Sequence, residues 1–394
     1  MHILFGARQT GKSTLLRAVL PRETVAIDLS EPGVRSRYLG DTSAFTSECR
    51  AMSKRRGATT VFVDEAQNVP AIFDAVQHLY DHDRRRWRFV LCGSSSRKLR
   101  KSGTNLLPGR SILHRLFPLT TVERPAAPAP VTAEHAIARL RWRSAPSELF
   151  PAADLETRLA FGELPGIAAA PERDRGSLLR SYAIAHLEEE IRREALVKDW
   201  AAFLRFLHLA ARESGQIVNY AAISRESGVS QPTVKSYYQL LEDMFVGFFV
   251  PSWSGSARKS VLSTPRFFVF DVGVRHGAAN VPVSRTTVQA APGPIFEQWV
   301  GIEIWKRLRY RGRGTLHYMR TKDGAEIDFI VAEAGGVTPI EVKWTERPTS
   351  ADCRHLRRFL DENRGTARRG VVVCRCPRPM QLDDRITAIP WSCL

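Results

Sequence analysis

Short apolar runs alternate with helix-patterned segments along the first third of the chain. Between the runs, apolar residues recur every three or four positions, as in residues 13–20 and 71–80, which is the spacing of an amphipathic helix. Strands that alternate with helices in this way predict a parallel α/β sheet whose helices cross over between neighbouring strands. The predicted strands are residues 3–5, 25–28, 59–64 and 88–93.

The pattern changes after residue 122. Pro125, Pro128 and Pro130 interrupt both periodicities, which indicates a domain boundary or a stiff linker. Residues 154–213 then follow a helical pattern. We therefore predict a first domain over residues 1–125, followed by a linker and helical region over residues 126–215.

Residues 219–245 have the pattern of a helix-turn-helix. A short helix over residues 220–227 ends at Gly228, and Ser230 is placed to cap a second helix that has Pro232 in its first turn. The apolar residues of the second helix share one face: Val234, Tyr237, Leu241 and Met244. The polar residues near its start point outward, where a recognition helix meets bases or phosphates: Gln231, Thr233, Lys235 and Ser236.

Two β-rich runs follow this motif, at residues 245–250 and 266–270, and the turn between them carries Arg258 and Lys259. The succession resembles a winged helix, which we place over residues 216–275. Such a fold can serve DNA binding or protein contacts, because a fold does not fix a function. The pattern leaves both readings open.

The last region, residues 276–394, is predicted to be a second α/β domain. A helix covers residues 296–308, and strands cover residues 315–320 and 326–331. The strands are joined across the turn-forming residues Lys322, Asp323 and Gly324. Another strand covers residues 338–343.

Composition changes this picture in one respect, the charge. Of the 394 residues, 58 are Lys or Arg and 41 are Asp or Glu, a formal net charge of +17. A surplus of this size favours a polyanionic partner such as DNA, although codon bias in a GC-rich genome would also enrich arginine. The chain lacks the pattern of a signal peptide or a membrane span, and its six cysteines are too few for a disulfide scaffold. We expect a cytoplasmic protein with no membrane partner.

A phosphate-binding loop follows the first predicted strand directly. Glycines allow the loop to curl so that backbone N–H groups point at one anion, while the lysine reaches the β- and γ-phosphates and the following hydroxyl can ligate Mg²⁺. The predicted helix after the loop places the phosphates at a helix N-terminus. The loop consists of Gly6, Ala7, Arg8, Gln9, Thr10, Gly11, Lys12, Ser13 and Thr14.

Two adjacent acids lie at the end of the strand predicted for residues 59–64. Asp64 is the last residue of this strand, and Glu65 follows it directly. Asp64 is expected to hold a magnesium ion opposite Ser13, and Glu65 to orient or deprotonate the attacking water. Together with the loop they predict hydrolysis of ATP or GTP.

Two further residues are candidates for the same reaction. Ser94, at the end of the strand at residues 88–93, would sense the γ-phosphate or its water, or else belong to an ordinary serine-rich loop. Arg110 is a candidate arginine finger, acting in its own or in a neighbouring subunit, or an ordinary surface arginine.

A second group of charged residues lies in the last region. Glu341 and Lys343 project from the same face of one strand, Asp328 is on the neighbouring strand, and Glu297 arrives from the helix. Asp328, Glu341 and Glu297 would share a Mg²⁺, while Lys343 would position or activate the water that attacks a phosphodiester. The order resembles the core of PD-(D/E)xK nucleases. The alternative is a nuclease-like fold kept for DNA binding or packing.

The order of all these parts resembles a group of prokaryotic AAA-type ATP-binding proteins. These join an ATPase core, a winged helix and a restriction-endonuclease-like C-terminal domain of unassigned function. The resemblance covers nearly the whole chain and rests on the phosphate loop together with residues 63–67, 93–96, 161–165, 270–273, 320–328 and 340–343. It implies nucleotide and magnesium roles for Lys12, Ser13, Asp64 and Glu65.

One feature departs from that group. Its members have a short helical segment before the first strand, which helps to cover the adenine, whereas here the strand begins almost at Met1. Either the native start lies upstream or base binding relies on other residues. The choice of ATP over GTP is implied by the resemblance alone.

Taken together, the sequence predicts a Mg²⁺-dependent ATPase that binds DNA and couples its nucleotide state to a nuclease-like C-terminal domain. The alternative from another class is an ATP-gated protein-interaction or signalling switch with a catalytically inactive C-terminal domain. A homo-oligomer or a protein partner is compatible with both.

Overall fold

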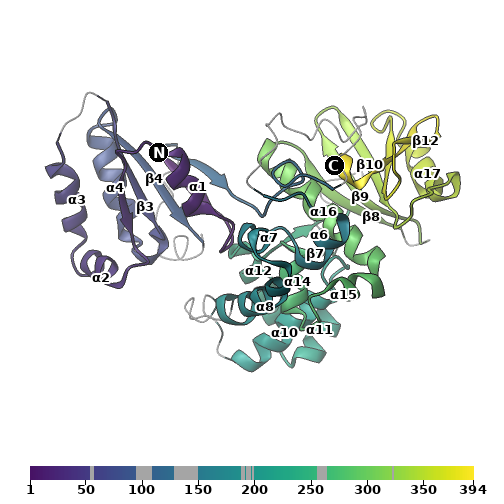
Figure 1. Ribbon diagram of the computed structural model, residues 1–394, viewed down its shortest axis with the longest axis horizontal. Helices are drawn as coiled ribbons and strands as arrows, with labels where there is room; N and C mark the ends of the chain where they lie inside the picture. The colour runs from purple at the N-terminus through teal and green to yellow at the C-terminus, as the bar shows by residue number, and fades with distance from the viewer. Residues whose placement is uncertain are drawn as a thin grey trace. The chain divides into compact units, whose positions relative to one another are not determined.

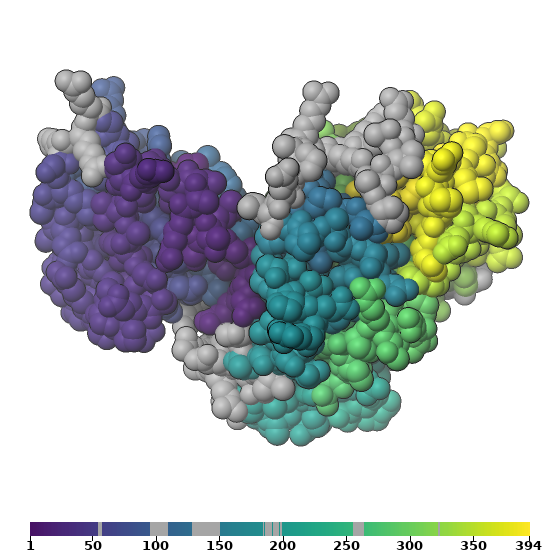
Figure 2. All heavy atoms as spheres, viewed as in Figure 1, coloured from purple at the N-terminus to yellow at the C-terminus, as the bar shows by residue number. Residues whose placement is uncertain are grey.

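The structure of the chain is a computed structural model, and it describes residues 1–53, 57–94, 109–127, 150–187, 191, 197, 199–254, 264–321 and 324–394. These residues form two compact units, Met1–Phe117 with Leu240–Val246 and Pro118–Gln239 with Gly247–Leu394. Side chains fill the spaces between the ribbons within each unit (Figure 2). The predicted turn residues Arg258, Lys259, Lys322 and Asp323 lie outside the described residues.

The first unit contains the predicted parallel sheet, with five strands in the order β2-β3-β4-β1-β5. Every neighbouring pair in it is parallel. The strands are β1 (His2–Phe5), β2 (Val25–Asp28), β3 (Thr59–Asp64), β4 (Trp87–Gly93) and β5 (Ile112–Arg115). The helices are α1 (Lys12–Val19), α2 (Pro32–Gly40), α3 (Thr42–Ala51) and α4 (Ala71–His82), with a 3₁₀ turn η1 at Ala66–Asn68.

Helices cover both faces of this sheet (Figure 1). Ile3 and Phe5 of β1 pack into a cluster with residues of α2, α3 and α4, whereas Leu4 packs with Leu16 of α1 on the opposite face. Since side chains alternate along a strand, a strand covered on both faces needs apolar residues at consecutive positions. This is why the strands of the first unit read as continuous apolar runs.

The second unit begins with a helical region. Its helices are α6 (Leu155–Phe161), α7 (Pro165–Ala169), α8 (Glu172–Ser181), the π-helical turn η3 (Tyr182–Leu187), α10 (Trp200–Arg212), α11 (Tyr220–Ser227), α12 (Gln231–Asp243), α14 (Val272–Ala278) and α15 (Arg285–Ala290). An antiparallel pair of strands, β6 (Gly247–Val250) and β7 (Arg266–Val269), follows α12. The last residues of α12 group with the first unit.

The helix-turn-helix pattern is confirmed as local structure. Gly228 adopts φ +77° between α11 and α12, a left-handed conformation that suits glycine. The apolar face of α12 is buried as predicted: Val234, Tyr237, Leu241 and Met244. Within the second unit, the rings of Tyr237 and Tyr238 pack edge-on against Phe203 and Phe206 of α10.

The C-terminal part of the second unit is a mixed sheet of six strands in the order β12-β13-β11-β10-β9-β8. The strands are β8 (Thr315–Arg320), β9 (Glu326–Glu333), β10 (Gly336–Val342), β11 (Gly370–Cys374), β12 (Met380–Asp383) and β13 (Ile386–Pro390). The helices are α16 (Pro292–Arg311) and α17 (Arg354–Glu362), with 3₁₀ turns η4 (Ser350–Cys353) and η5 (Trp391–Cys393). α16 begins four residues earlier than predicted, because Pro292 and Pro294 fit a first helical turn, where no backbone donor is needed.

The proline-rich segment that begins near Pro125 is predicted from the sequence to be a boundary or linker. Its start is buried within the second unit. Arg124 is only 1% exposed, and its guanidinium and that of Arg158 both pair with the buried Glu163 carboxylate. The Asp271 carboxylate in turn accepts a hydrogen bond from the Glu163 amide at 2.7 Å. The motifs at residues 161–165 and 270–273 therefore anchor this segment, which lies on the second unit's side of the division at Phe117.

Among the helices that the structure describes, none combines the length and the apolar character that a bilayer crossing requires.

Candidate functional site

The predicted phosphate loop lies between β1 and α1. A Cβ added to Gly6 would come within 2.3 Å of the Leu116 carbonyl oxygen, and Gly11 has φ +88°, so both positions require glycine. Lys12 is 6% exposed, and its ammonium donates to the carbonyl oxygens of Gly6 and Ala7, both at 2.9 Å. The loop thus closes around its own lysine.

The predicted acidic pair lies where β3 ends. Asp64 is 5% exposed, and its Oδ1 accepts a hydrogen bond from the Glu65 amide at 3.0 Å. Glu65 has φ +52°, a strained conformation for a residue with a side chain. The parallel strands β1, β4 and β3 all present their carboxyl ends at the same edge of the sheet, which is the usual ligand edge of such folds.

A side-chain bridge joins two of the predicted catalytic residues. The amide nitrogen of Gln67 donates to the Glu65 carboxylate at 2.5 Å and to the Ser94 hydroxyl at 3.1 Å. Gln67 and Ser94 are both buried. The structure therefore brings Ser94 to the acidic pair, and it adds Gln67 to the site, a residue that the sequence analysis quoted without giving it a role.

Arg110 does not lie at this edge. It precedes β5, which pairs with β1 in parallel so that Arg115 is level with Phe5. At about 3.3 Å per residue, Arg110 is roughly 16 Å back along the strand direction, at the opposite edge of the sheet. Its guanidinium pairs with Asp81 at 2.8 Å. The expectation of an arginine finger for its own subunit's site is therefore wrong.

Arg115 is the arginine that ends β5 at the ligand edge, and it is exposed. The sequence analysis missed it, because only the pairing register of β1 and β5 shows which end of the strand faces the loop. The amide of Leu116 donates to the Phe5 carbonyl at 2.8 Å, which continues the ladder to the start of the loop.

The residues at this edge fit a magnesium nucleotide. Ser13 and Asp64 supply the hydroxyl and carboxylate oxygens that Mg²⁺ prefers, and a triphosphate would supply further oxygens. Gly6 lets the loop backbone lie against the Leu116 carbonyl, a close approach that a Cβ would prevent. The nearby Cys92 thiol is held neutral, because burial raises its pKa and the Asp64 carboxylate raises it further.

The second predicted site also assembles, within the second unit. Antiparallel pairing of β9 and β10 matches Phe329 with Ile340, which brings Asp328 beside Glu341. Lys343 donates to Glu341 Oε1 at 2.7 Å, as expected for side chains on one face of a strand. The Val342 amide donates to Asp328 Oδ2, also at 2.7 Å.

A further residue joins this acid cluster, which we define as Glu297, Glu326, Asp328 and Glu341. Arg266 of β7 donates to Glu297 Oε1 at 2.7 Å and also pairs with Glu326. Its guanidinium lies 4.8 Å from the centre of the Tyr318 ring. No sequence signal marked Arg266, because the contact joins residues 31 and 60 positions apart.

Burial and mutual repulsion shift the pKa values in the acid cluster. Burial raises the pKa of Asp328 well above its usual range, and the charges of Glu297 and Glu341 raise it further. Burial also raises the pKa values of Glu297 and Glu341, although Arg266 and Lys343 oppose the change. Burial alone would lower the pKa of Lys343, but its hydrogen bond to Glu341 and the negative charges of Glu341 and Asp328 together outweigh this, and the net shift is upward.

The predicted magnesium site of Glu297, Asp328 and Glu341 is not formed. Within the described ranges, no group of three or more His, Cys, Asp and Glu side chains is arranged to hold a metal ion. The physical reason is that one oxygen of each carboxylate already has a partner: Arg266 holds Glu297, Lys343 holds Glu341, and a backbone amide holds Asp328. The arrangement does not fit a divalent cation.

The predicted recognition surface of α12 is open. Gln231, Lys235 and Ser236 are exposed, and Thr233 is half-buried. Ser230 Oγ accepts a hydrogen bond from the Thr233 amide at 3.4 Å, which supports the predicted cap.

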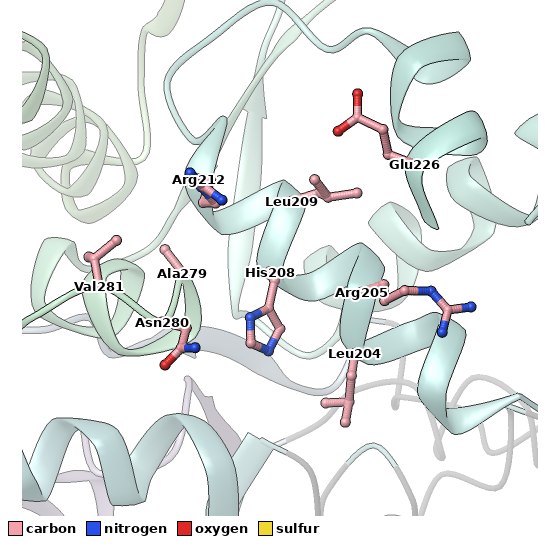
Figure 3. Close-up of a pocket in the computed structure, with 9 residues that line it drawn as sticks. All are labelled: Leu204, Arg205, His208, Leu209, Arg212, Glu226, Ala279, Asn280 and Val281. Carbon is pink, nitrogen blue, oxygen red and sulfur yellow. The ribbon is translucent and has the colours of Figure 1, made fainter. Parts of the chain in front are cut away.

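A surface pocket of about 540 Å³ lies elsewhere in the second unit (Figure 3). α10 contributes Arg205, His208 and Arg212, and the Arg205 guanidinium donates to the Ser227 carbonyl at 3.0 Å. None of the predicted site residues lines this pocket.

Comparison with protein families divides the chain into three parts. Residues 1–124 match the AAA domain, residues 152–285 a domain of unknown function (DUF8612), and residues 292–394 a domain of unknown function (DUF4143). The N-terminal match supports an AAA-type, ATP-binding domain and agrees with the parallel sheet and its loop.

Similar whole proteins are known from bacteria. An uncharacterized protein of Mycobacterium tuberculosis (strain ATCC 25618 / H37Rv) is 25% identical over 388 residues, 98% of this chain and 79% of the relative. An uncharacterized protein of Haemophilus influenzae (strain ATCC 51907 / DSM 11121 / KW20 / Rd) is 22% identical over 358 residues, 87% of this chain and 82% of the relative. A crystal structure of protein VC1899 from Vibrio cholerae aligns over 99% of this chain and 94% of its own, at 14% identity and a TM-score of 0.21.

Proposed function

We propose that the protein hydrolyses ATP in a magnesium-dependent reaction at the carboxyl edge of the first unit's sheet. The observation that carries this proposal is the Glu65–Gln67–Ser94 bridge beside an intact phosphate loop. A carboxylate held by a buried amide is a positioned base rather than a solvated strand end.

Each residue has a distinct role in this proposal. Lys12 leaves the carbonyls of Gly6 and Ala7 to contact the β- and γ-phosphates, and the loop amides bind the same oxygens. Magnesium, when bound, neutralises charge that develops on the phosphates, and Ser13 and Asp64 are the residues that would hold it. Glu65 accepts the proton of the attacking water.

Steady-state hydrolysis tests this proposal. The chain is expected to release phosphate from ATP with Mg²⁺ and to stop when EDTA removes the metal. A chain that binds ATP but shows no hydrolysis above background at any Mg²⁺ concentration would contradict the enzymatic role.

A second candidate function is DNA binding through a winged helix formed by α11, α12, β6 and β7. The supporting observation is the exposed polar face at the start of α12, together with the net charge of +17. Nucleotide state would then alter how this surface is presented. The C-terminal domain is proposed to be nuclease-like in fold.

Salt-dependent binding separates this function from its alternative, an ATP-gated protein switch with an inactive C-terminal domain. DNA affinity should fall steeply as salt rises, and Lys235→Ala should reduce the slope of log affinity against log salt by about 1. Arg173→Ala on α8 removes an equally exposed charge far along the chain and should leave the slope unchanged. Weak binding with no salt dependence would favour the protein switch, which the closed acid cluster also favours over DNA cleavage.

A further inference from the structure

The acid cluster in the second unit combines several carboxylates with a cation from a different element. We propose that the Arg266 guanidinium is the resident cation of this cluster and that it excludes divalent metal ions from it. The proposal concerns the second unit alone and does not depend on ATP hydrolysis.

The contacts of Arg266 show that it is a fixed part of the cluster. One guanidinium nitrogen is 2.7 Å from Glu297 Oε1, and the other terminal nitrogen pairs with Glu326. Tyr318 lies under the guanidinium and is itself held by a 2.6 Å hydrogen bond to the Thr264 carbonyl. Arginine suits this position because a planar fork can bind two carboxylates and stack on a ring at once.

Burial strengthens this arrangement. The Arg266 side chain is 5% exposed, so its charge is removed from water and depends on its two acidic partners. A divalent ion ligated by Glu297 would have to displace this guanidinium or lie beside it. Two cations a few ångströms apart in a poorly hydrated site repel strongly, so the ion is excluded while Arg266 is in place.

The remaining acids of the cluster carry negative charge that Arg266 does not pair with directly. Glu341 Oε2 is buried and has no hydrogen-bond partner among the described residues, and the buried Asp328 lies beside Glu341 on the neighbouring strand. These are acids with more negative charge than their surroundings neutralise, and a metal ion would supply the missing charge if Glu297 were released.

Arg266 belongs to β7, whereas the acids belong to α16, β9 and β10, all labelled in Figure 1. The cation and the acids therefore come from separate elements of the second unit. Removing the guanidinium should convert the cluster from a closed ion-pair network into a metal site.

Metal binding tests this directly, with Mn²⁺ as the probe and without nucleotide, so that the phosphate loop holds no metal–nucleotide complex. Equilibrium dialysis of the full chain should show no saturable Mn²⁺ binding for the wild type. Arg266→Gln should bind a single Mn²⁺ per chain, at least about tenfold more tightly than the wild type. Mn²⁺ should also raise the melting temperature of Arg266→Gln and leave that of the wild type unchanged.

Two matched variants complete the design. Arg266→Lys keeps a positive charge at the site and should still exclude Mn²⁺. Arg266→Gln combined with Glu341→Gln should lose the site that the single change creates. If Arg266→Gln fails to fold, Arg266→Ala takes its place, and saturable Mn²⁺ binding by that variant is still expected.

Two results would overturn the proposal. One is saturable Mn²⁺ binding by the wild type that Glu341→Gln abolishes, because the arginine would then not exclude the metal. The other is a folded Arg266→Gln protein that binds no Mn²⁺, because Arg266 would then be a structural ion-pair partner only.

Discussion

The nucleotide site of the first unit and the acid cluster of the second unit are built from the same residue types. Each has a lysine and carboxylates at the end of buried strands. In the first, Lys12 is held by neutral carbonyls and Glu65 by a neutral amide. In the second, Lys343 and Arg266 pair with carboxylates directly. The difference is that protein cations pair directly with the carboxylates of the second site, which explains why its acids do not form the expected magnesium site.

Among the variants that test this comparison of the two sites, Glu65→Gln is expected to have the largest effect, on the rate of ATP hydrolysis. Loss of the general base should lower kcat for ATP hydrolysis by about 10²–10⁴-fold while ATP binding persists. Phosphate release and equilibrium binding, measured side by side, check both parts. Asp74→Asn, which neutralises an exposed acid on α4, serves as the control and should hydrolyse ATP at the wild-type rate.

Lys12→Ala should have the next largest effect, now on binding. Removing charge-assisted hydrogen bonds to the phosphates should weaken ATP affinity by about 10–100-fold, from the usual strength of such bonds. Calorimetry measures the ATP affinity. Arg17→Ala is the control, because it removes a positive charge from an exposed position on the same helix. Unchanged ATP affinity in Lys12→Ala would refute the assignment of the loop.

Gln67→Leu tests whether the Glu65–Ser94 bridge positions the base. Because a hydrogen bond to a charged group is worth about 1.5–3 kcal/mol, kcat should fall about tenfold or more while KM stays the same. A change confined to thermal stability would mean that Gln67 is structural only.

Asp328→Asn should have the smallest effect, which is a change in melting temperature. The sign of this change shows whether the protein is more stable with or without the Asp328 charge. Burial first, and then Glu297 and Glu341, raise the pKa of the folded-state Asp328 above its unfolded value of about 4. The stability linked to the bound proton is present below pH 4 and is lost as pH rises through the folded-state pKa.

Asparagine keeps an oxygen for the Val342 amide and carries no charge. Asp328→Asn should therefore melt about 2–4 °C above the wild type at pH 8, with a smaller difference towards pH 4. The exposed Asp384→Asn is the control and should change the melting temperature little at either pH. A lower melting temperature for Asp328→Asn at pH 8 would show that the Asp328 charge is needed.

Much of the fold follows from local sequence. The strand runs of the first unit, Gly228 of the helix-turn-helix and the Glu341–Lys343 face are short-range patterns, and the structure confirms them. The burial of the segment around Arg124 does not follow from local sequence. Its guanidinium pairs with the Glu163 carboxylate, which is 39 positions away. The sequence spacing alone cannot show such a pairing.

The errors at the sites have the same origin. The sequence offers Arg110 as a candidate arginine finger, but the register of β5 against β1 places it at the other edge of the sheet and Arg115 at the ligand edge. The magnesium site was expected from three acids at suitable positions, but Arg266 reaches them from another element. Both outcomes depend on pairing between distant segments, which periodicity does not encode.

The most direct test of the account is to count the Mn²⁺ ions that the wild-type chain binds with and without a non-hydrolysable ATP analogue. The account predicts no saturable binding without the analogue and one ion with it, and this ion should be lost in Ser13→Ala. An ion bound without nucleotide that depends on Glu341, or no ion in the presence of the analogue, would contradict it.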